Sequence, residues 1–433
     1  MEFASYAAAL SHVHGLPRFK RSNSRDEEKL VLKQLGHPEQ QGHFIHVTGT
    51  NGKGSTSNAI AHMLLRAGCT VGLYTSPFIM RFNERIQIDN QPVSDEVIRR
   101  AAGTVATAIE QLQGDHPGLF LKEFEFVTCM GFVIFAQAPV DVAVIEVGIG
   151  GTHDSTNVIT PDVAVISNVA MDHMAQLGNT LTAIATEKSG IIKPGVPAVT
   201  GKLPAEAATV VAARVQECGS PLYRFGEEFS AKGHADAKLF GEKFTYQDEG
   251  GKLTSLEFPL LGSYQVQNAA VAIKAAKLYA AKQDLPLTAA DIRHGLAASH
   301  WPVRMERVSS EPLIVLDGAH NPDGVSHALA SIRNFDYEHV TLIVGILADK
   351  AMDKMLKSIA ATGAEVFLVQ VPDNPRAATE ADYRAAGADP QWRFCDWHDA
   401  LADSIREHPQ GLTLILGSLY LASAVRQELF AAE

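Results

Sequence analysis

Cysteine is scarce in this sequence, and the few cysteines are far apart. The 433-residue chain has only Cys69, Cys129, Cys218 and Cys395, without a CxxC pair or the Cys/His spacing of a zinc site. A disulfide framework and a thiolate metal site are therefore not predicted.

The sequence also lacks a hydrophobic run long enough to span a bilayer. Its first stretch, MEFASYAAALSHVHG, is small and apolar but has no basic leader before it. We therefore expect a cytoplasmic protein.

Basic residues are outnumbered by acidic ones, 37 against 49, which gives a net charge of −12. This balance disfavours a general nucleic-acid or anionic-membrane binder, although a local basic pocket is compatible with it. Hydrophobic residues at 46% and charged residues at 20% are typical of a globular protein and disfavour long disorder and a coiled-coil rod. The length predicts two large domains or about three of ordinary size.

Short runs of valine, isoleucine and leucine alternate with helical stretches in the first half of the chain. This pattern is typical of a parallel sheet with helices on both faces. The expected strands are 43–47, 71–75, 140–147 and 161–167, and the expected helices include 58–68 and 182–192.

The pattern changes between about 228 and 260, where apolar and polar residues alternate around Asp248, Glu249, Gly250 and Gly251. This predicts a small antiparallel hairpin at the edge of the first domain. Helices are expected at 264–282 and near 288–298.

The segment 299–312, SHWPVRMERVSSEP, breaks the periodicity with two prolines. We place the domain boundary there, which gives domains 1–299 and 300–433. The second domain is expected to have a smaller sheet with strands at 312–318, 339–345, 365–371 and 412–418.

The most informative motif is GTNGKGST, residues 49–56, which follows a predicted strand and precedes a predicted helix. Its glycines let backbone amides turn toward a phosphate, Lys53 supplies charge, and the helix N-terminus adds its dipole. The motif departs from GxxxxGK[ST], because Val47 replaces the first glycine and Gly54 follows the lysine, so Ser55 or Thr56 must supply the hydroxyl. The alternative is a glycine-rich turn with a surface lysine. The motif favours an ATP-binding P-loop domain.

Two more groups are expected at the same edge of the sheet. Glu146 ends the apolar strand in VAVIEVGIGG, where a carboxylate would hold the magnesium that bridges the phosphates, or would simply reach solvent. Gly148, Gly150 and Gly151 favour close approach of a ligand to the backbone. Asp172 and His173 follow the next strand, and we predict His173 as a metal ligand.

Taken together, the motifs resemble those of the folylpolyglutamate synthase family, the folate branch of the Mur ligases. The resemblance covers nearly the whole chain and rests on an ordered set of segments: GTNGKGS, YTSPF (74–78), EVGIGG (146–151), DSTNV (154–158), MDH (171–173), QVQNAAVA, WPVRME, DGAHNP (317–322) and GSLY (417–420).

The resemblance implies a tetrahydrofolate:L-glutamate ligase that forms ADP. A folate carboxylate takes the γ-phosphoryl group of ATP, and the amine of glutamate attacks the acyl phosphate. It implies a Mur ligase-like ATP-binding domain and a Rossmann-like, glutamate ligase-like C-terminal domain. Reduced folate, glutamate and ATP are the expected partners of a monomer that binds neither nucleic acid nor membrane.

The resemblance also implies roles for individual residues. Lys53, Lys188 and His320 are the implied catalytic residues, with Lys188 carbamylated, although a lysine at a helix C-terminus is the alternative. The implied magnesium ligands are Ser76, Glu146, His173 and Lys188. The implied ATP contacts are Asn51, Gly52, Lys53, Gly54, Ser55, Asn268 (adenine), Arg304 (phosphate) and Asp317 (ribose).

Folate recognition is implied for Phe78, Arg85, Phe124, Glu125 and Asp154, because an aromatic face can stack on a pterin while a carboxylate accepts its ring NH groups. Three alternatives stay open: Phe124 and Phe126 as core residues, Arg304 paired with Glu306, and Asn321 as a helix cap.

Other functions are also considered. Relatives that also make dihydrofolate often carry threonine near the position of Lys122 in KEFEF, so this departure argues against dihydrofolate synthase activity. The remaining alternatives are a Mur-type ligase for a muropeptide and a nucleotide-gated switch.

Overall fold

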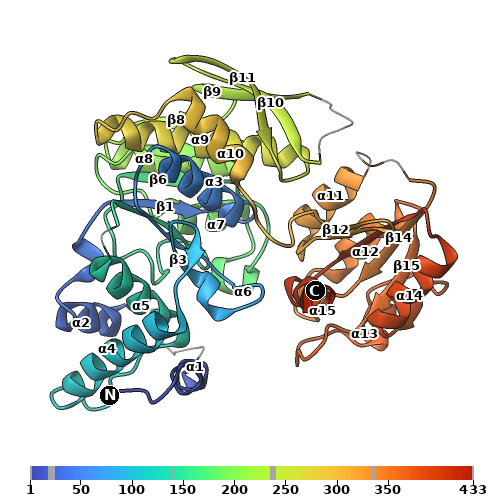
Figure 1. The fold of residues 1–433 in the computed structure, drawn as a ribbon, viewed down its shortest axis with the longest axis horizontal. Coiled ribbons are helices and arrows are strands. Elements are labelled where there is room, and N and C mark those ends of the chain that lie inside the picture. The colour runs from blue at the N-terminus through green and yellow to red at the C-terminus, as the bar shows by residue number, and fades with distance from the viewer. Residues whose placement is uncertain are drawn as a thin grey trace. The chain divides into compact units, whose positions relative to one another are not determined.

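The computed structural model describes residues 2–17, 25–138, 140–234, 240–332, 335 and 337–431 (Figure 1). The chain divides into two compact units. The first comprises Met1–Lys232, Thr245–Leu256 and Gln267–Ser299, and the second comprises Gly233–Phe244, Glu257–Val266 and His300–Glu433. The assignment of 1–299 and 300–433 as two domains stays a prediction.

The first unit contains an eight-stranded sheet in the order β4-β3-β2-β5-β1-β6-β7-β8. Six of these strands are parallel, whereas β3 is antiparallel to β2 and β4 is antiparallel to β3. The strands are β1 (Phe44–Thr48), β2 (Val71–Tyr74), β3 (Ile86–Ile88), β4 (Gln91–Pro92), β5 (Val142–Glu146), β6 (Val163–Ile166), β7 (Ala198–Thr200) and β8 (Leu222–Arg224).

Helices cover this sheet, and the four predicted strands are confirmed with every residue of β1, β2, β5 and β6 buried. The apolar residues of α4 and α5 share one core cluster with Phe44 and Tyr74 of the sheet. The helices and 3-10 turns are α1 (Tyr6–Gly15), α2 (Asp26–Gln34), η1 (Pro38–Gln40), α3 (Lys53–Arg66), η2 (Phe82–Arg85), α4 (Asp95–Gln113), α5 (Glu123–Gln137), α6 (Met174–Leu177), α7 (Leu181–Ser189), α8 (Ala205–Glu217), α9 (Ser263–Lys282) and α10 (Ala289–Ala298).

The predicted hairpin is present as β10 (Glu242–Asp248) and β11 (Gly251–Phe258). With β9 (Phe229–His234) it forms a separate three-stranded sheet in the order β11-β10-β9. Its residues divide between the two units, so the prediction that the hairpin belongs to the edge of the first domain alone is too simple.

The second unit has a six-stranded sheet in the order β12-β13-β17-β14-β15-β16, parallel except for β12. The segment read as an irregular boundary contains the antiparallel strand β12. The elements are β12 (Glu306–Ser310), β13 (Leu313–Leu316), α11 (Pro322–Ser331), β14 (Val340–Val344), α12 (Met352–Ala360), β15 (Glu365–Val369), α13 (Glu380–Ala385), β16 (Arg393–Cys395), α14 (Trp397–Glu407), β17 (Leu412–Leu416) and α15 (Leu419–Ala431).

The predicted α/β architecture is therefore confirmed in both units. None of the described helices combines the length and the hydropathy needed to cross a membrane.

Candidate active site

The phosphate loop lies at the carboxyl end of β1, between the ends of β5 and β6. Gly52 has a left-handed φ of 79° and precedes the first residue of α3, Lys53. A Cβ atom at Gly49 would lie 1.9 Å from Oγ of Ser167. The loop can therefore adopt this path because both positions are glycine.

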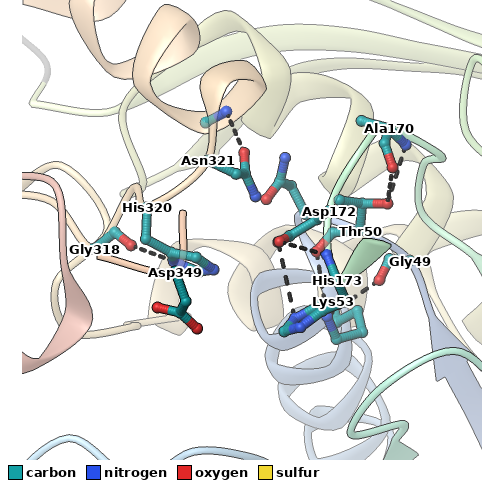
Figure 2. A network of polar contacts seen from close by, with 12 residues as sticks. Gly49, Thr50, Lys53, Ala170, Asp172, His173, Gly318, His320, Asn321 and Asp349 are labelled. Atoms are coloured by element: carbon teal, nitrogen blue, oxygen red, sulfur yellow. Dashed lines mark hydrogen bonds and ion pairs between the residues drawn. The ribbon is translucent and has the colours of Figure 1, made fainter. Parts of the chain in front are cut away.

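Hydrogen bonds from the segment after β6 hold the loop in place, and Figure 2 shows the contact between Thr50 and Ala170. The backbone N–H of Asn51 donates to Oδ1 of Asn168 at 2.7 Å, and Oγ of Ser167 donates to the carbonyl of Asn51 at 2.6 Å. The Thr50 hydroxyl donates to the carbonyl of Ala170 at 3.0 Å. These contacts shape the loop in the protein itself.

Lys53 turns back over the loop that precedes it. Its Nζ donates to the carbonyls of Gly49 at 3.1 Å and Thr50 at 3.3 Å (Figure 2). The side chain of Asn268 lies against Gly52, where an added Cβ would be 2.5 Å from Oδ1. Lys53 and Asn268, two of the residues predicted to contact ATP, therefore lie at the phosphate loop.

Glu146 is the last residue of β5 and is 4% exposed. Ser76 follows the neighbouring strand β2, and its backbone N–H donates to Oε2 of Glu146 at 3.2 Å. The two predicted ligands therefore meet at one edge of the sheet. The alternative that Glu146 extends into solvent is not what the structure shows.

Asp172 and His173 come after β6 at the same edge. Oδ1 of Asp172, which is 9% exposed, accepts the backbone N–H of His173 at 2.8 Å. Its other oxygen lies 3.8 Å from Nε2 of His173. The structure thus holds the histidine beside a buried carboxylate (Figure 2).

Lys188 is on α7 and is 2% exposed. Burial, and then the charge of Lys53, lower the pKa of its ammonium to about 7, while Asp172, Asp154 and Glu187 oppose the shift. A lysine with this pKa is partly a neutral amine near neutral pH, which an exposed lysine is not.

The residues at this edge fit a magnesium ion. Glu146 and Asp172 are buried carboxylates beside a phosphate loop, and a buried carboxylate is costly without a cation or donors. Ser76 and Glu146 offer the oxygen ligands that magnesium prefers, while His173 is a less usual nitrogen ligand.

Packing within the chain, and not the expected approach of a ligand, explains two of the glycines in EVGIGG. A Cβ at Gly148 would lie 2.6 Å from the ring of Phe124, and one at Gly151 would lie 2.5 Å from the carbonyl of Glu187. At these two positions glycine is required by packing of the chain against itself, so close approach of a ligand is not needed to explain them.

Two of the predicted folate contacts, Phe124 and Arg85, lie beside other aromatic rings. Phe126 is fully buried in the core, whereas Phe124 is half-buried beside Tyr74 at a ring separation of 6.2 Å. The guanidinium of Arg85 lies 5.5 Å from the ring centroid of Phe78. The core alternative therefore holds for Phe126, and Phe124 is only partly covered.

The two predicted folate carboxylates have partners within the protein. Asp154 accepts the N–H of Ile149 at 2.9 Å and the hydroxyl of Thr156, and burial raises its pKa. Oε1 of Glu125 lies 3.1 Å from Nζ of Lys122. Asp154 therefore organises its own loop, and Glu125 caps the start of α5.

Sequence reasoning missed a buried polar group beneath these residues. Glu28 of α2 is fully buried, and neither of its carboxylate oxygens has a hydrogen bond in the described part of the chain. Its burial, and the charges of Glu125 and Asp154, raise its pKa well above the usual range. Only the spacing of α2 could have placed it inward, since no motif marks it.

In the second unit, Asp317 follows β13 and is 3% exposed. Its carboxylate accepts the backbone N–H groups of Met305 and Ala319, both at 2.8 Å, and burial raises its pKa. Nη1 of Arg304 donates to the carbonyl of Val303 at 3.1 Å. The expected alternative partner of Arg304, Glu306, instead pairs with Arg426 at 2.9 Å.

His320 and Asn321 continue the same segment (Figure 2). Nδ1 of His320 lies 2.9 Å from the carbonyl of Gly318. Oδ1 of Asn321 accepts the N–H of Gly324 at 2.8 Å and caps α11, so the capping alternative for Asn321 is confirmed. Since a carbonyl only accepts, Nδ1 of His320 carries the proton and Nε2 is the nitrogen that can take one up.

Comparison with known proteins gives a consistent result over the whole chain. The Mur ligase middle domain matches residues 130–276, and the Mur ligase glutamate ligase domain matches residues 303–419. The folylpolyglutamate synthase of Lacticaseibacillus casei is 50% identical over 432 residues, which cover 99% of this chain and 100% of the relative.

Two further proteins extend the comparison. The dihydrofolate synthase/folylpolyglutamate synthase of Bacillus subtilis is 34% identical over 99% of this chain and 100% of its own length. A solved FPGS–AMPPCP–folate complex has a TM-score of 0.90 and 48% identity, and the match covers 98% of this chain and 99% of that one. The chain therefore belongs to the folylpolyglutamate synthase family of Mur-type ligases.

Proposed function

We propose that this protein adds L-glutamate to the glutamate tail of reduced folates in an ATP-dependent reaction through an acyl phosphate. The observation that carries the proposal is the phosphate loop at the edge of the eight-stranded sheet, in a chain that matches folylpolyglutamate synthases over their full length. The solved relative with AMPPCP and folate supports the choice of both substrates.

The first step needs the phosphates of ATP to be held in place. We propose that the loop residues Asn51, Gly52, Gly54 and Ser55 and the N-terminus of α3 bind the phosphates, and that Lys53 supplies the positive charge. The backbone N–H of Asn51 is not one of the proposed phosphate donors, because it donates to Asn168. An oxygen of the folate carboxylate attacks the γ-phosphorus, the bond to the β-phosphate oxygen breaks, and ADP leaves.

The second step forms the amide. The amine of glutamate attacks the acyl carbon, the bond from that carbon to the phosphate oxygen breaks, and phosphate leaves with its electron pair. The amine must lose protons on the way, and Nε2 of His320 is the proposed acceptor, because the Gly318 carbonyl holds the proton on Nδ1.

Ser76, Glu146 and His173 are the proposed magnesium ligands, and Lys188 is the proposed ligand of a second magnesium once carbamylated. Bound magnesium supplies the positive charge that offsets the phosphates and the substrate carboxylate. The buried Lys188, with its pKa of about 7, supports carbamylation, because the neutral amine attacks carbon dioxide to form an N–C bond and releases a proton.

The proposed nucleotide contacts include Asn268 for adenine, Arg304 for phosphate and Asp317 for ribose, in an ATP-binding domain of 1–299 and a glutamate ligase-like domain of 300–433. Asn268 adjoins Gly52, so the position of its amide supports a contact with the nucleotide and, of the parts of ATP, favours the phosphates over adenine.

For the pterin end of folate we propose Phe78, Arg85, Phe124, Glu125 and Asp154. Phe124 is suited to stacking because its ring is only partly covered. Asp154 and Glu125 already accept protein donors, so they are proposed to shape this end of the site as well as to bind the ring.

Dihydrofolate synthase activity is a second candidate, favoured by the bifunctional relative at 34% identity. Lys122 argues against it, because relatives that also make dihydrofolate often carry threonine near this position. The ammonium of Lys122 lies against Glu125 in this chain.

Product mass tests these possibilities directly. Purified protein is incubated with ATP, magnesium and glutamate, together with tetrahydrofolate, dihydropteroate or a muropeptide precursor. We expect added glutamate residues with tetrahydrofolate and none with the muropeptide. Glutamate added only to dihydropteroate, or ATP hydrolysis with no ligated product, would overturn the proposal.

A further inference from the structure

Three potential metal ligands gather at the amino ends of neighbouring strands in the second unit. His339 precedes β14, Glu365 is the first residue of β15, and His408 precedes β17. These strands are adjacent in the order β17-β14-β15. Asp317 and His320 follow the carboxyl end of β13, and Arg304 precedes the antiparallel strand β12 at that same edge. The cluster is therefore at the opposite edge of the sheet from the predicted site residues of this unit.

The separations suit a metal ion. Oε2 of Glu365 lies 3.4 Å from Nε2 of His339 and 3.6 Å from Nε2 of His408. The three ligand atoms all lie within 4.8 Å of one another. In a tetrahedral zinc site with bonds of about 2.0–2.2 Å, ligand atoms are roughly 3.3–3.5 Å apart.

We propose that His339, Glu365 and His408 bind a zinc-type divalent cation, with solvent completing its coordination. Two imidazoles and one carboxylate form a set that zinc favours, whereas magnesium favours oxygen ligands alone.

Backbone hydrogen bonds and the hydroxyl of Thr341 hold these three residues in place. The carbonyl of His339 accepts the N–H of Leu412 at 2.8 Å, and the carbonyl of His408 accepts the N–H of Gly411 at 2.9 Å. The Thr341 hydroxyl donates to Oε2 of Glu365 at 3.2 Å. The backbone bonds fix the segments that carry the two histidines, and the Thr341 bond orients a proposed ligand atom, as hydrogen bonds to metal ligands commonly do.

Nε2 of His339 gives an independent reason to expect a ligand. This nitrogen is shielded from solvent and has no hydrogen bond to any described residue, although it faces the carboxylate. A buried nitrogen without a hydrogen bond is unfavourable even with Oε2 of Glu365 at 3.4 Å, and a cation between the two atoms would satisfy both groups.

The two imidazole rings need a small movement to bind one ion. They are stacked at a centroid separation of 3.5 Å with 17° between their planes, so both planes cannot contain the same ion. The side chains are 36% and 33% exposed, which leaves room for one ring to tilt.

Equilibrium dialysis of the full-length protein against zinc chloride, followed by metal analysis, tests the proposal. We compare the parent with His339→Ala, His408→Ala and Glu365→Gln. His398→Ala is the matched control, since His398 contacts Asp396 at 2.6 Å and Glu428 at 2.9 Å without a second histidine. Any zinc bound by the phosphate-loop edge is common to all variants, so only the difference between them is informative.

We expect the parent and His398→Ala to bind one more zinc ion than the other variants, or to bind it at least tenfold more tightly. Cobalt(II) should give tetrahedral absorption bands in the parent that these three variants lose. Because Glu365→Gln preserves side-chain volume, it decides the question if an alanine variant fails to fold. Equal zinc stoichiometry and affinity in the parent and the folded cluster variants would overturn the proposal and leave only the contacts of the two histidines with Glu365.

Discussion

Lys53 and Lys188 belong to the same edge of the eight-stranded sheet but lie in different surroundings. Lys53 is partly accessible and donates to two loop carbonyls, whereas Lys188 is buried and its pKa is lowered to about 7. These surroundings suit Lys53 to its proposed role as a cation for phosphate, and Lys188 to its proposed role as an amine that reacts. The comparison teaches that burial separates the proposed roles of two residues of the same type.

The largest expected effect comes from removing the cation of the loop. Lys53→Ala should fold normally but lose ATP turnover about a hundredfold to a thousandfold, because the transferring phosphate loses a preorganised charge. Steady-state turnover checks this, with exposed Lys33→Ala as the control. Unchanged turnover in folded protein would contradict the phosphate-loop assignment.

Lys188→Ala distinguishes the proposed roles of the two lysines by the sign of the charge that each substitution removes. If Lys188 acts as a carbamate, the variant should lose most activity and regain part of it in an acetate series, because acetate supplies the missing oxygen ligand. Acetate should not restore Lys53→Ala, which lacks a cation. A flat or falling acetate series in folded Lys188→Ala would count against carbamylation.

Loss of a proposed metal ligand should raise the magnesium requirement before it weakens nucleotide binding. Glu146→Gln and His173→Ala are expected to raise the magnesium concentration needed for half-maximal activity at least tenfold, by analogy with the loss of groups that support ligands. Magnesium titrations and separate AMPPCP binding measurements check this. Exposed Asp115→Asn is the control, and titrations that coincide with the parent curve would exclude both residues as ligands.

Gly151→Ala tests how closely α7, and with it Lys188, must approach the glycine loop. The added Cβ would lie 2.5 Å from the Glu187 carbonyl and 2.9 Å from that of Lys188, so backbone must shift. We expect the free energy of unfolding, measured in urea, to fall by about 1–3 kcal/mol. Gly15→Ala, which meets no atom within 4 Å, is the control, and equal stability of both variants would show that α7 yields freely.

A second buried base, His46 of β1, extends the comparison to stability. Burial, and the charges of Lys193 and Arg25, lower its pKa to about 3, so the unfolded chain binds a proton that the folded chain does not as pH falls below about 6.5. Between pH 7 and pH 5 the parent should lose about 2 kcal/mol more unfolding free energy than His46→Gln. Parallel pH profiles would contradict a neutral, buried imidazole.

Local patterns predicted the parts of the site that depend on neighbouring residues. The strand, glycines and lysine of 44–53 form one continuous unit, and Asn321 caps the helix that follows it. The partners of Gly148 and Gly151 are Phe124 and Glu187, which no local pattern connects to them.

The parts that were missed depend on distant packing. Glu28 is directed inward by α2, and β12 is a strand only because β13 pairs with it. His339 and His408 are far apart in the sequence and meet because β14 and β17 are adjacent. Such contacts follow from the order of strands in a sheet, which the sequence pattern alone did not supply.

The hydrogen bonds from Ser167, Asn168 and Ala170 to the phosphate loop also affect the entropy of binding. A free glycine-rich loop loses conformational entropy when a ligand orders it, at a cost of about 1–2 kcal/mol for each residue fixed. Here the loop is ordered by its neighbours during folding. Nucleotide binding therefore need not supply that ordering free energy, and more of the interaction with the phosphates is retained as affinity.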